Sequence, residues 1–256
     1  MSTAPPGRTA PPVLQLDRVS RHFGGLKAVD GVTLEVRPGA RHALIGPNGA
    51  GKTTLFNVIS GETTATSGSI RFLGADVTTQ PSHARAARGI ARTFQIIRLF
   101  PSLTVRENML LACQALDPLK YAILRPLSSC RTLTQRADDL LGEFGLADLQ
   151  HESARHLSYG DQRKLEVALS MAGRPRLLLL DEPMAGLSGA GRDAMQRLLA
   201  QLDPAIAVLL IEHDMDVAFG FADTVTVLNH GTVLAHGSTA EVSANEQVQR
   251  SYLGVG

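Results

Sequence analysis

The chain has 256 residues, of which 44% are hydrophobic and 19% are charged, and 25 Lys and Arg balance 24 Asp and Glu. This length and composition fit one large globular domain, with or without an insertion, and exclude a low-complexity chain. A net charge of +1 also argues against a protein whose main partner is nucleic acid, because such a protein needs a basic face.

The first 12 residues are rich in Pro and small polar residues, and no apolar stretch among them resembles a secretory signal. We therefore expect a disordered tail over residues 1–12 and a cytoplasmic protein. No apolar run reaches the length of about 18 residues that predicts a membrane-spanning helix. Cys113 and Cys130 have no metal-ligand spacing, so we expect two reduced thiols.

The first third of the chain alternates between strand and helix patterns. Apolar and polar residues alternate as in half-buried strands, and a short apolar strand then enters a Gly-rich turn before the first helical pattern. The predicted strands are 13–23, 32–39, 40–46, 68–73 and 90–95, and the predicted helices are 53–60 and 83–89.

The chain as a whole predicts an α/β fold with a parallel-sheet core, an N-terminal antiparallel β-subdomain and a helical insertion. Between about residues 104 and 156 the apolar residues follow helical spacing, and we place an inserted α-helical subdomain at about 95–156. Three apolar strands separated by helices then follow, which is typical of a parallel sheet buried on both faces. These strands are LLLLDEP, AVLLIEHD and TVTVLNHG, and a short helical pair is expected over 237–253.

Residues 46–53, GPNGAGKT, match a phosphate-binding loop between an apolar strand and a helix. Such glycines let backbone N–H groups surround a phosphate, and the helix N-terminus adds a positive dipole end. Lys52 is expected to reach the β- and γ-phosphate oxygens, and Thr53 to bind Mg²⁺. The loop residues expected at the nucleotide are Gly46, Pro47, Asn48, Gly49, Ala50, Gly51, Lys52, Thr53 and Thr54.

Two carboxylates, Asp181 and Glu182, end the apolar strand 177–180, at the edge where parallel sheets bind their ligands. Asp181 is expected to hold Mg²⁺, directly or through water, and Glu182 to take a proton from the attacking water. Alone, such a pair is more often a helix cap or a solvated turn. The phosphate loop on the same predicted sheet favours the catalytic interpretation.

Ser158 precedes a predicted helix and Asp161 follows three positions later, which is the pattern of a capping box. A helix N-terminus of this kind can also bind an anion. Both interpretations of this segment, LSYGDQ, remain open at the level of the residues themselves.

Taken in order, the phosphate loop, Gln95 in RTFQ, the segment LSYGDQ, LLLLDEP and His213 in LLIEHDM resemble an ABC-transporter ATPase subunit. The resemblance runs from about Leu14 to the end of the chain. Further segments look like the ATPases of branched-chain amino-acid importers. These segments are RHFGGLKAVDGV, RTFQIIRLFPSLTVREN, SYGDQRKLE, IEHDMD and SYLG.

The resemblance implies further roles. It places adenine on Phe23, makes Gln95 a contact of Mg²⁺ and the attacking water, and brings His213 to the γ-phosphate beside Glu182. Ser158 and Gly160 would contact ATP bound to the opposite subunit. By itself, Phe23 is equally compatible with a core residue at a strand end, and Gln95 is compatible with a solvated strand end. A lone histidine at a strand end, such as His213, is more often structural.

Two departures from the general ABC pattern are visible. The signature segment has Tyr159 and Asp161 where the pattern LSGGQ has Gly and Gln, which puts bulk beside the nucleotide. Ser188 stands where many members have Asp, in a loop that couples the two sites of a dimer. These departures are compatible with altered communication between the two sites and with a heterodimer.

The resemblance implies an ATP- and Mg²⁺-dependent ATPase on the inner face of the cell membrane. Its partners would be permease subunits, a second ATPase subunit in a homo- or heterodimer and, indirectly, a solute-binding protein. A groove between Gln95 and Asn108, with Leu99 and Phe100, would receive the permease, unless these residues belong to the core of the insert. The alternatives are the ATPase of lipopolysaccharide export, a soluble ABC ATPase without a transporter, and a purely structural protein.

Overall fold

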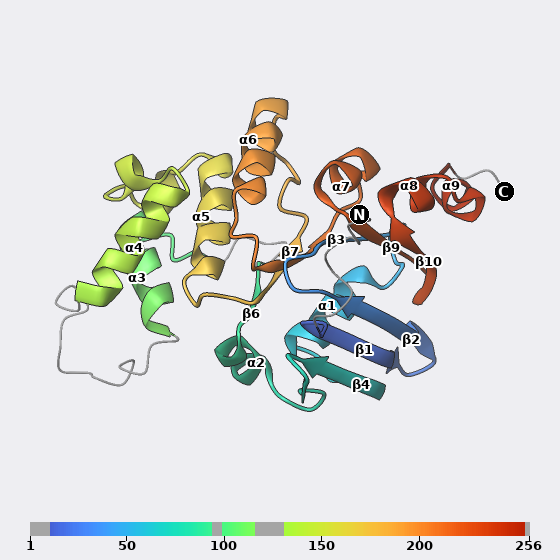
Figure 1. Cartoon of the computed structure of the whole chain (residues 1–256). Coiled ribbons are helices and arrows are strands. Elements are labelled where there is room, and N and C mark those ends of the chain that lie inside the picture. Colours follow the sequence, from blue (N-terminus) through green and yellow to red (C-terminus); the bar gives the residue numbers. More distant parts are fainter. Residues whose placement is uncertain (1–10, 94–98, 116–130, 254–256) are drawn as a thin grey trace, which may run out of the picture. The chain divides into compact units, whose positions relative to one another are not determined.

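The computed structural model describes residues 11–93, 99–115 and 131–253. The chain divides into two compact units, Met1–Arg85 with Asp203–Gly256, and Ala86–Leu202. The predicted phosphate loop lies in the first unit, and the carboxylates Asp181 and Glu182 lie in the second. Figure 1 shows the helices and strands of both units, coloured along the sequence from blue at the N-terminus to red at the C-terminus.

The first unit contains the predicted N-terminal antiparallel sheet, with strand order β2-β1-β4-β5. The strands are β1 (Leu14–Phe23), β2 (Leu26–Val36), β4 (Ser67–Phe72) and β5 (Ala75–Asp76). The first residues of β1 alternate between buried and more exposed positions, because successive side chains of a strand point to opposite faces. The alternating pattern in the sequence therefore identified this sheet correctly.

The same unit contains a parallel arrangement around β3 (Arg41–Ile45). This strand pairs with β8 (Ala207–Ile211) on one side and β9 (Thr224–Asn229) on the other, both parallel. All residues of β8 are buried, as expected for a strand covered on both faces. The sequence did not predict β10 (Thr232–Ser238), which pairs antiparallel to β9.

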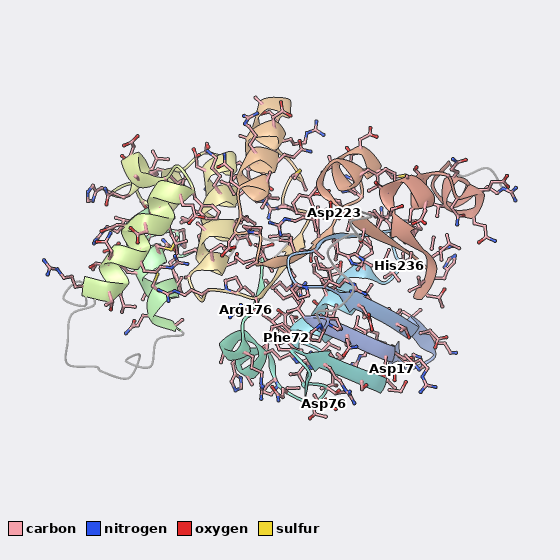
Figure 2. All side chains as sticks on the ribbon, in the orientation of Figure 1. Asp17, Phe72, Asp76, Arg176, Asp223 and His236 are labelled. Atoms are coloured by element: carbon pink, nitrogen blue, oxygen red, sulfur yellow. The ribbon has the colours of Figure 1, made fainter. Side chains whose placement is uncertain are left out.

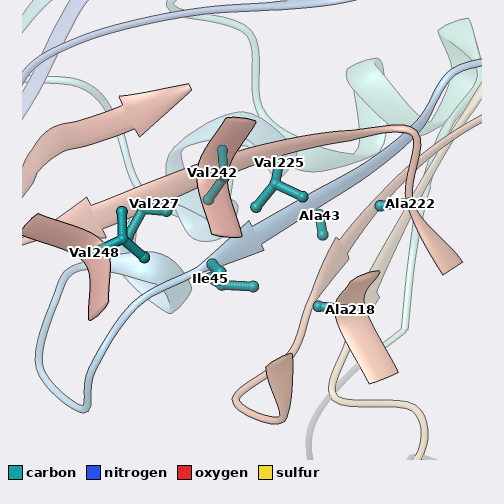
Figure 3. Packing of buried hydrophobic residues seen from close by; sticks show 8 residues of the cluster. All are labelled: Ala43, Ile45, Ala218, Ala222, Val225, Val227, Val242 and Val248. Atoms are coloured by element: carbon teal, nitrogen blue, oxygen red, sulfur yellow. The ribbon is translucent and has the colours of Figure 1, made fainter. Parts of the chain in front are cut away.

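An apolar cluster lies under the helices that follow β8 and β10, namely α7 (Met215–Phe221), α8 (Thr239–Ser243) and α9 (Glu246–Leu253). Figure 3 shows side chains from β3 and β9 meeting those from the three helices. Because these side chains are small and branched, the helices lie close to the strands. The cluster comprises Ala43, Ile45, Ala218, Ala222, Val225, Val227, Val242 and Val248.

The helix after the Gly-rich turn, α1 (Lys52–Ser60), is held at its C-terminal end by Arg85 of α2 (Ser82–Arg88). Arg85 is 1% exposed. Its guanidinium donates to the carbonyl oxygens of Val58 and Ile59 at 2.7 and 2.8 Å, and to those of Thr78 and Gln80 at 2.9 Å each. Carbonyl groups that a helix end leaves unpaired are thereby satisfied by a cation.

The second unit contains two short parallel strands and a group of helices. The strands β6 (Ile90–Arg92) and β7 (Leu177–Asp181) pair along their length. Three helices lie side by side, α3 (Val105–Ala115), α4 (Arg131–Glu143) and α5 (Tyr159–Met171) (Figure 1). The 3-10 turns Ala147–Leu149 and Ala154–His156 and the helix α6 (Gly189–Ala200) complete the described part of this unit.

The observed elements agree with the predicted α/β fold class, and most bounds differ from the prediction by a few residues. The predicted strand 90–95 ends at Arg92, and Gln95 lies outside the described residues. Within residues 11–93, 99–115 and 131–253, no helix has both the length and the apolar character that a bilayer crossing needs.

Candidate active site

The phosphate-binding loop follows β3 and ends where α1 begins. Gly51, the N-cap of α1, has φ +100°, and Leu55 N–H donates to its carbonyl oxygen at 2.8 Å. A Cβ at Gly51 would lie 2.3 Å from the carbonyl oxygen of Ala28 on β2. Only glycine therefore fits at position 51, where the loop approaches the backbone of β2, and glycine is the residue that the motif has at this position.

Two further backbone hydrogen bonds fix the loop within the first unit. Gly231, in the turn between β9 and β10, donates its N–H to the carbonyl oxygen of Ala50 at 3.0 Å. The Gly231 carbonyl oxygen in turn accepts from the N–H of Asp30 at 2.8 Å. The position of the loop is thus set by backbone groups from β2 and from the turn after β9.

Lys52 is 7% exposed and lies over the loop. Its ammonium group donates to the carbonyl oxygens of Gly46 and Pro47 at 2.6 and 3.1 Å. A buried cation at a helix N-terminus, held by the carbonyl groups of a Gly-rich loop, is suited to receive phosphate oxygens. Asn48, Gly49 and Thr53 are exposed, so the open side of the loop carries the residues expected at the nucleotide.

These features fit a nucleotide phosphate group. The loop offers a backbone shape that a side chain would fill, a lysine ammonium group and an exposed Thr53 hydroxyl for a hydrated Mg²⁺. Within the described part of the chain, no group of three or more His, Cys, Asp or Glu side chains forms a protein-only metal site. Mg²⁺ in phosphoryl-transfer sites is usually held by one or two protein groups with the substrate phosphates.

Phe23 ends β1 and is 48% exposed, so one apolar ring is available on the surface of the first unit. The guanidinium carbon of Arg21 lies 4.4 Å from the centre of this ring. Arg21 also donates to the carbonyl oxygen of Thr64 at 3.0 Å. The cation is thereby held against the ring, and an aromatic ring of this kind can stack with a purine.

In the second unit, Asp181 ends β7 and is 2% exposed. Its carboxylate accepts from Arg92 of β6 at 3.1 Å, and Arg92 is itself 7% exposed. The backbone N–H of Asp181 donates to the Thr93 hydroxyl at 3.3 Å. This ion pair could not be predicted from local sequence patterns, because its two members are 89 positions apart.

Glu182 lies in the left-handed region with φ +48°, which is uncommon for a residue with a side chain. Such strain is often found at functional sites, because the surrounding structure must hold it. Here the carbonyl oxygen of Glu182 accepts from the N–H of Ala185 at 3.1 Å. The unusual backbone therefore occurs at the residue predicted to act as the base.

Ser158 is the N-cap of α5, as its sequence pattern predicts. Its hydroxyl accepts from the Asp161 N–H at 3.1 Å and donates to the Asp161 carboxylate at 2.6 Å. Lys164 donates to the other carboxylate oxygen of Asp161 at 2.9 Å. Ser158, Gly160, Asp161, Lys164, Ser188 and other residues line an open hollow of about 380 Å³.

Tyr159 connects the start of α5 with the segment that follows Glu182. Its hydroxyl donates to the carbonyl oxygen of Ala185 at 3.2 Å and accepts from Arg163 at 3.1 Å. A Cβ at Gly186 would lie 3.1 Å from the tyrosine ring, so the ring packs directly on this glycine. Arg163 is also paired at 3.0 Å with Glu166, and both are buried. The added bulk is therefore accommodated against Ala185 and Gly186.

His213 follows β8 in the first unit and is 58% exposed. Its Nδ1 lies 4.0 Å from a carboxylate oxygen of the buried Glu212. Asp214 then caps α7 by accepting from the N–H groups of Asp216 and Val217 at 3.0 and 3.4 Å. The exposed imidazole is thus carried on a short turn fixed by the cap.

The predicted permease groove is described only in part, because residues 94–98 lie outside the described residues. Phe100 is 59% exposed. The buried Asn108 accepts from the Phe100 N–H at 2.9 Å and donates to the carbonyl oxygens of Phe100 and Thr104 at 3.1 and 2.9 Å. Asn108 is therefore a structural residue that holds the turn on which Phe100 is exposed.

Comparisons with known proteins agree with the sequence resemblance. Residues 29–185 match the family described as ABC transporter, and residues 232–256 match the family described as branched-chain amino acid ATP-binding cassette transporter. The second match includes β10, α8 and α9.

Individual relatives extend this similarity over nearly the whole chain. The "high-affinity branched-chain amino acid transport ATP-binding protein BraF" of Pseudomonas aeruginosa is 40% identical over 252 residues, covering 95% of this chain and 98% of BraF. LivG of Escherichia coli K12, which carries the same description, is 40% identical over 250 residues, covering 95% of this chain and 98% of LivG. The crystal structure of the ADP conformation of an ATP-binding cassette is 29% identical, with a TM-score of 0.85 over 96% of this chain and 100% of the other.

Proposed function

The chain belongs to the ABC transporter family of ATP-binding proteins, and on that premise we propose that it hydrolyses ATP for an importer of branched-chain amino acids or related amino-acid-like solutes. The observation that carries this proposal is the phosphate loop, whose backbone and lysine have the form that a triphosphate requires, together with 40% identity to BraF and LivG. The match at residues 232–256 supports the solute class.

The first unit would bind the nucleotide. The loop N–H groups and Lys52 would bind the phosphate oxygens. Lys52 would then exchange its hydrogen bonds to the carbonyl oxygens of Gly46 and Pro47 for stronger ones to charged phosphate oxygens. The exposed ring of Phe23 would stack with adenine, with Arg21 against the ring. His213 would contact the γ-phosphate.

Hydrolysis would depend on Glu182 as general base. Glu182 would take a proton from water as the water oxygen bonds to the γ-phosphorus and the bond to the ADP oxygen breaks. Thr53, Asp181 and Gln95 would hold Mg²⁺, which when bound neutralises charge on the β- and γ-phosphate oxygens. Lys52, together with Ser158 and Gly160 of an opposite subunit, would stabilise the remaining charge.

The assembly would contain two ATPase subunits, each completing the site of the other, on permease subunits at the inner face of the membrane. The segment at about 95–156 would serve as the inserted helical subdomain, with Leu99 and Phe100 in contact with the permease. The exposed ring of Phe100 supports this last assignment. Co-purification with permease subunits that survives Leu99→Asp together with Phe100→Asp would contradict it.

Two variants test the assignment of ATP hydrolysis. Glu182→Gln should lower turnover by at least about a hundredfold, because a general base contributes about 10²–10⁴-fold, while ATP binding persists. Lys52→Ala should lose ATP binding itself, since the ammonium group is the charged ligand of the loop. Turnover can be followed by phosphate release and binding by a fluorescent ATP analogue.

The two measurements separate the alternatives. Full turnover in Glu182→Gln would remove the general-base assignment, and unchanged ATP affinity in Lys52→Ala would remove the phosphate-loop assignment. For the transported solute, the alternative of lipopolysaccharide export is tested by identifying the permease that co-purifies with the chain.

A further inference from the structure

The signature segment carries a negative charge at a place that is proposed to meet another anion. Asp161 stands in the first turn of α5 and lines the hollow at Ser158, where the proposed function places the γ-phosphate. The general pattern has an uncharged Gln at this position. A carboxylate there would repel a triphosphate unless another group compensates for its charge.

The contacts of Asp161 show that compensation. Lys164 donates to one carboxylate oxygen at 2.9 Å, and the Ser158 hydroxyl donates to the other at 2.6 Å. Partial burial alone would raise the pKa of Asp161, but hydrogen bonds from Ser158 and Lys164, with the lysine charge, hold that pKa below its ordinary value. The residue is therefore an anion with two donors.

One of these donors is needed elsewhere. The Ser158 hydroxyl has a single proton, and that proton is directed to Asp161. For Ser158 to donate to a phosphate oxygen, the hydroxyl has to turn away from Asp161. Among the described residues, the Lys164 ammonium group is then the side-chain donor that the carboxylate keeps. Loss of a donor to a partly buried carboxylate is costly.

We propose that Lys164 is a positioning residue for ATP-dependent pairing of two copies of this chain. By neutralising Asp161, it allows the Ser158 hydroxyl to turn to the γ-phosphate of ATP bound to the second copy. Lys164 also lines the hollow, but in this proposal it acts through Asp161 and not by contact with the nucleotide. This inference rests on the proposed function, because it requires that ATP bind to the phosphate loop.

The test compares four full-length proteins, the wild type, Lys164→Ala, Asp161→Gln and the double variant. For each, ATP turnover per chain is measured against protein concentration, which gives the concentration at half-maximal turnover. Lys164→Ala should raise that concentration about fivefold, as expected for loss of one partly buried charge interaction. Asp161→Gln should leave it within about twofold of wild type, because the charge that needs compensation is gone.

The double variant decides the question. Removing Lys164 should have no further effect when Asp161 is Gln, so the double variant should match Asp161→Gln. A merely structural lysine would give the same loss in both backgrounds, and that result would overturn the inference. Arg250→Ala is the matched control, since it removes the cation of an exposed pair with Glu246 on α9, 3.1 Å apart.

Binding of a fluorescent ATP analogue to dilute protein separates this inference from the proposed function. It should be unchanged in all four proteins and lost in Lys52→Ala. If turnover of the wild type does not rise with protein concentration while ATP still binds through Lys52, pairing of two copies is wrong and this inference is wrong with it. If Lys52 has no effect on binding, the proposed function is wrong.

Discussion

The phosphate loop and the signature segment are held in place by different means. Backbone hydrogen bonds and a close approach to Ala28 fix the loop, and a Cβ at Gly51 has no space. The signature segment is fixed instead by side chains at the surface, with Tyr159 45% exposed and Ser158 exposed. Of the two, only the signature segment departs from the general ABC pattern.

The difference determines which substitutions each of the two regions should accept. The backbone of the loop can approach Ala28 so closely only where residue 51 has no side chain, so Gly51 should accept no substitution. A contact between side chains can be replaced by another of similar geometry. The hydrogen bond from the Tyr159 hydroxyl to the Ala185 carbonyl oxygen depends on one side chain, and that between Lys164 and Asp161 depends on two.

The comparison predicts its largest effect at Gly51. Gly51→Ala should lower the free energy of unfolding by about 3 kcal/mol or more, because it adds a clash with the Ala28 carbonyl oxygen at 2.3 Å to the cost of a positive φ. ATP binding should also be lost. Urea unfolding and binding of a fluorescent ATP analogue measure the two effects.

Gly49→Ala is the matched control for stability. Gly49 also has a positive φ, +79°, but a Cβ there would meet nothing within 4 Å. The expected loss is about 1 kcal/mol, from backbone strain alone. Equal losses at the two glycines would show that the close approach to Ala28 does not constrain the loop.

A buried histidine in β3, the strand that leads into the phosphate loop, should make the stability of the fold depend on pH. His42 of β3 is 1% exposed, and its Nε2 is hydrogen bonded at 2.8 Å to the Thr226 hydroxyl, which also bonds His236 of β10 at 2.8 Å. Figure 2 labels His236. Burial, with the charge of His236, lowers the pKa of His42 from 6.5 to about 3.

Between pH 6.5 and about 3, the unfolded chain therefore binds a proton at His42 that the folded chain does not. The free energy of unfolding should fall as the pH falls through this window, by up to ~1.4 kcal/mol per pH unit from this residue, or about 2 kcal/mol at pH 5. Above pH 6.5 it should add no pH dependence. Urea unfolding at pH 7.5, 6 and 5 measures it.

His42→Gln should lower the slope of the unfolding free energy against pH by up to the ~1.4 kcal/mol per pH unit that one proton contributes. His83→Gln, at an exposed position of α2, should keep the wild-type slope. A wild-type pH dependence in His42→Gln would show that the buried imidazole is not its source.

The smallest effect is expected in the signature segment. Tyr159→Phe keeps the ring on Gly186 but loses the hydrogen bonds with Ala185 and Arg163, so unfolding free energy should fall by about 1 kcal/mol. Ser170→Ala, on the same helix, should cost less, because the Ser170 hydroxyl donates to the Val167 carbonyl oxygen within that helix and ties α5 to no other segment among the described residues. A loss as large as that at Gly51 would contradict the contrast between the two regions.

Local sequence signals predicted most of the fold and part of the site. The phosphate loop and the Ser158 cap are set by residues a few positions apart, so their patterns identified them. β10 was missed, because its apolar and polar residues alternate only weakly and none of its residues is fully buried; its pairing with β9 defines it.

Contacts between distant residues could not be predicted. Arg92 meets Asp181 across 89 positions, and Tyr159 meets Ala185 across 26. Neither pairing follows from periodicity or from a motif, because it depends on how strands and turns are packed. The roles of Gln95, His213 and Phe23 came from the resemblance and remain proposals.

Arg85 has a consequence for the order in which the chain can fold. The helix that begins with Lys52 is completed at its other end by a guanidinium group 26 or 27 positions further along the chain. During synthesis, the early strands and the phosphate loop emerge from the ribosome before Arg85 does. The helix behind the loop therefore gains the hydrogen bonds at its C-terminal end only after α2 has emerged, so this helix is completed later than the phosphate loop is synthesised.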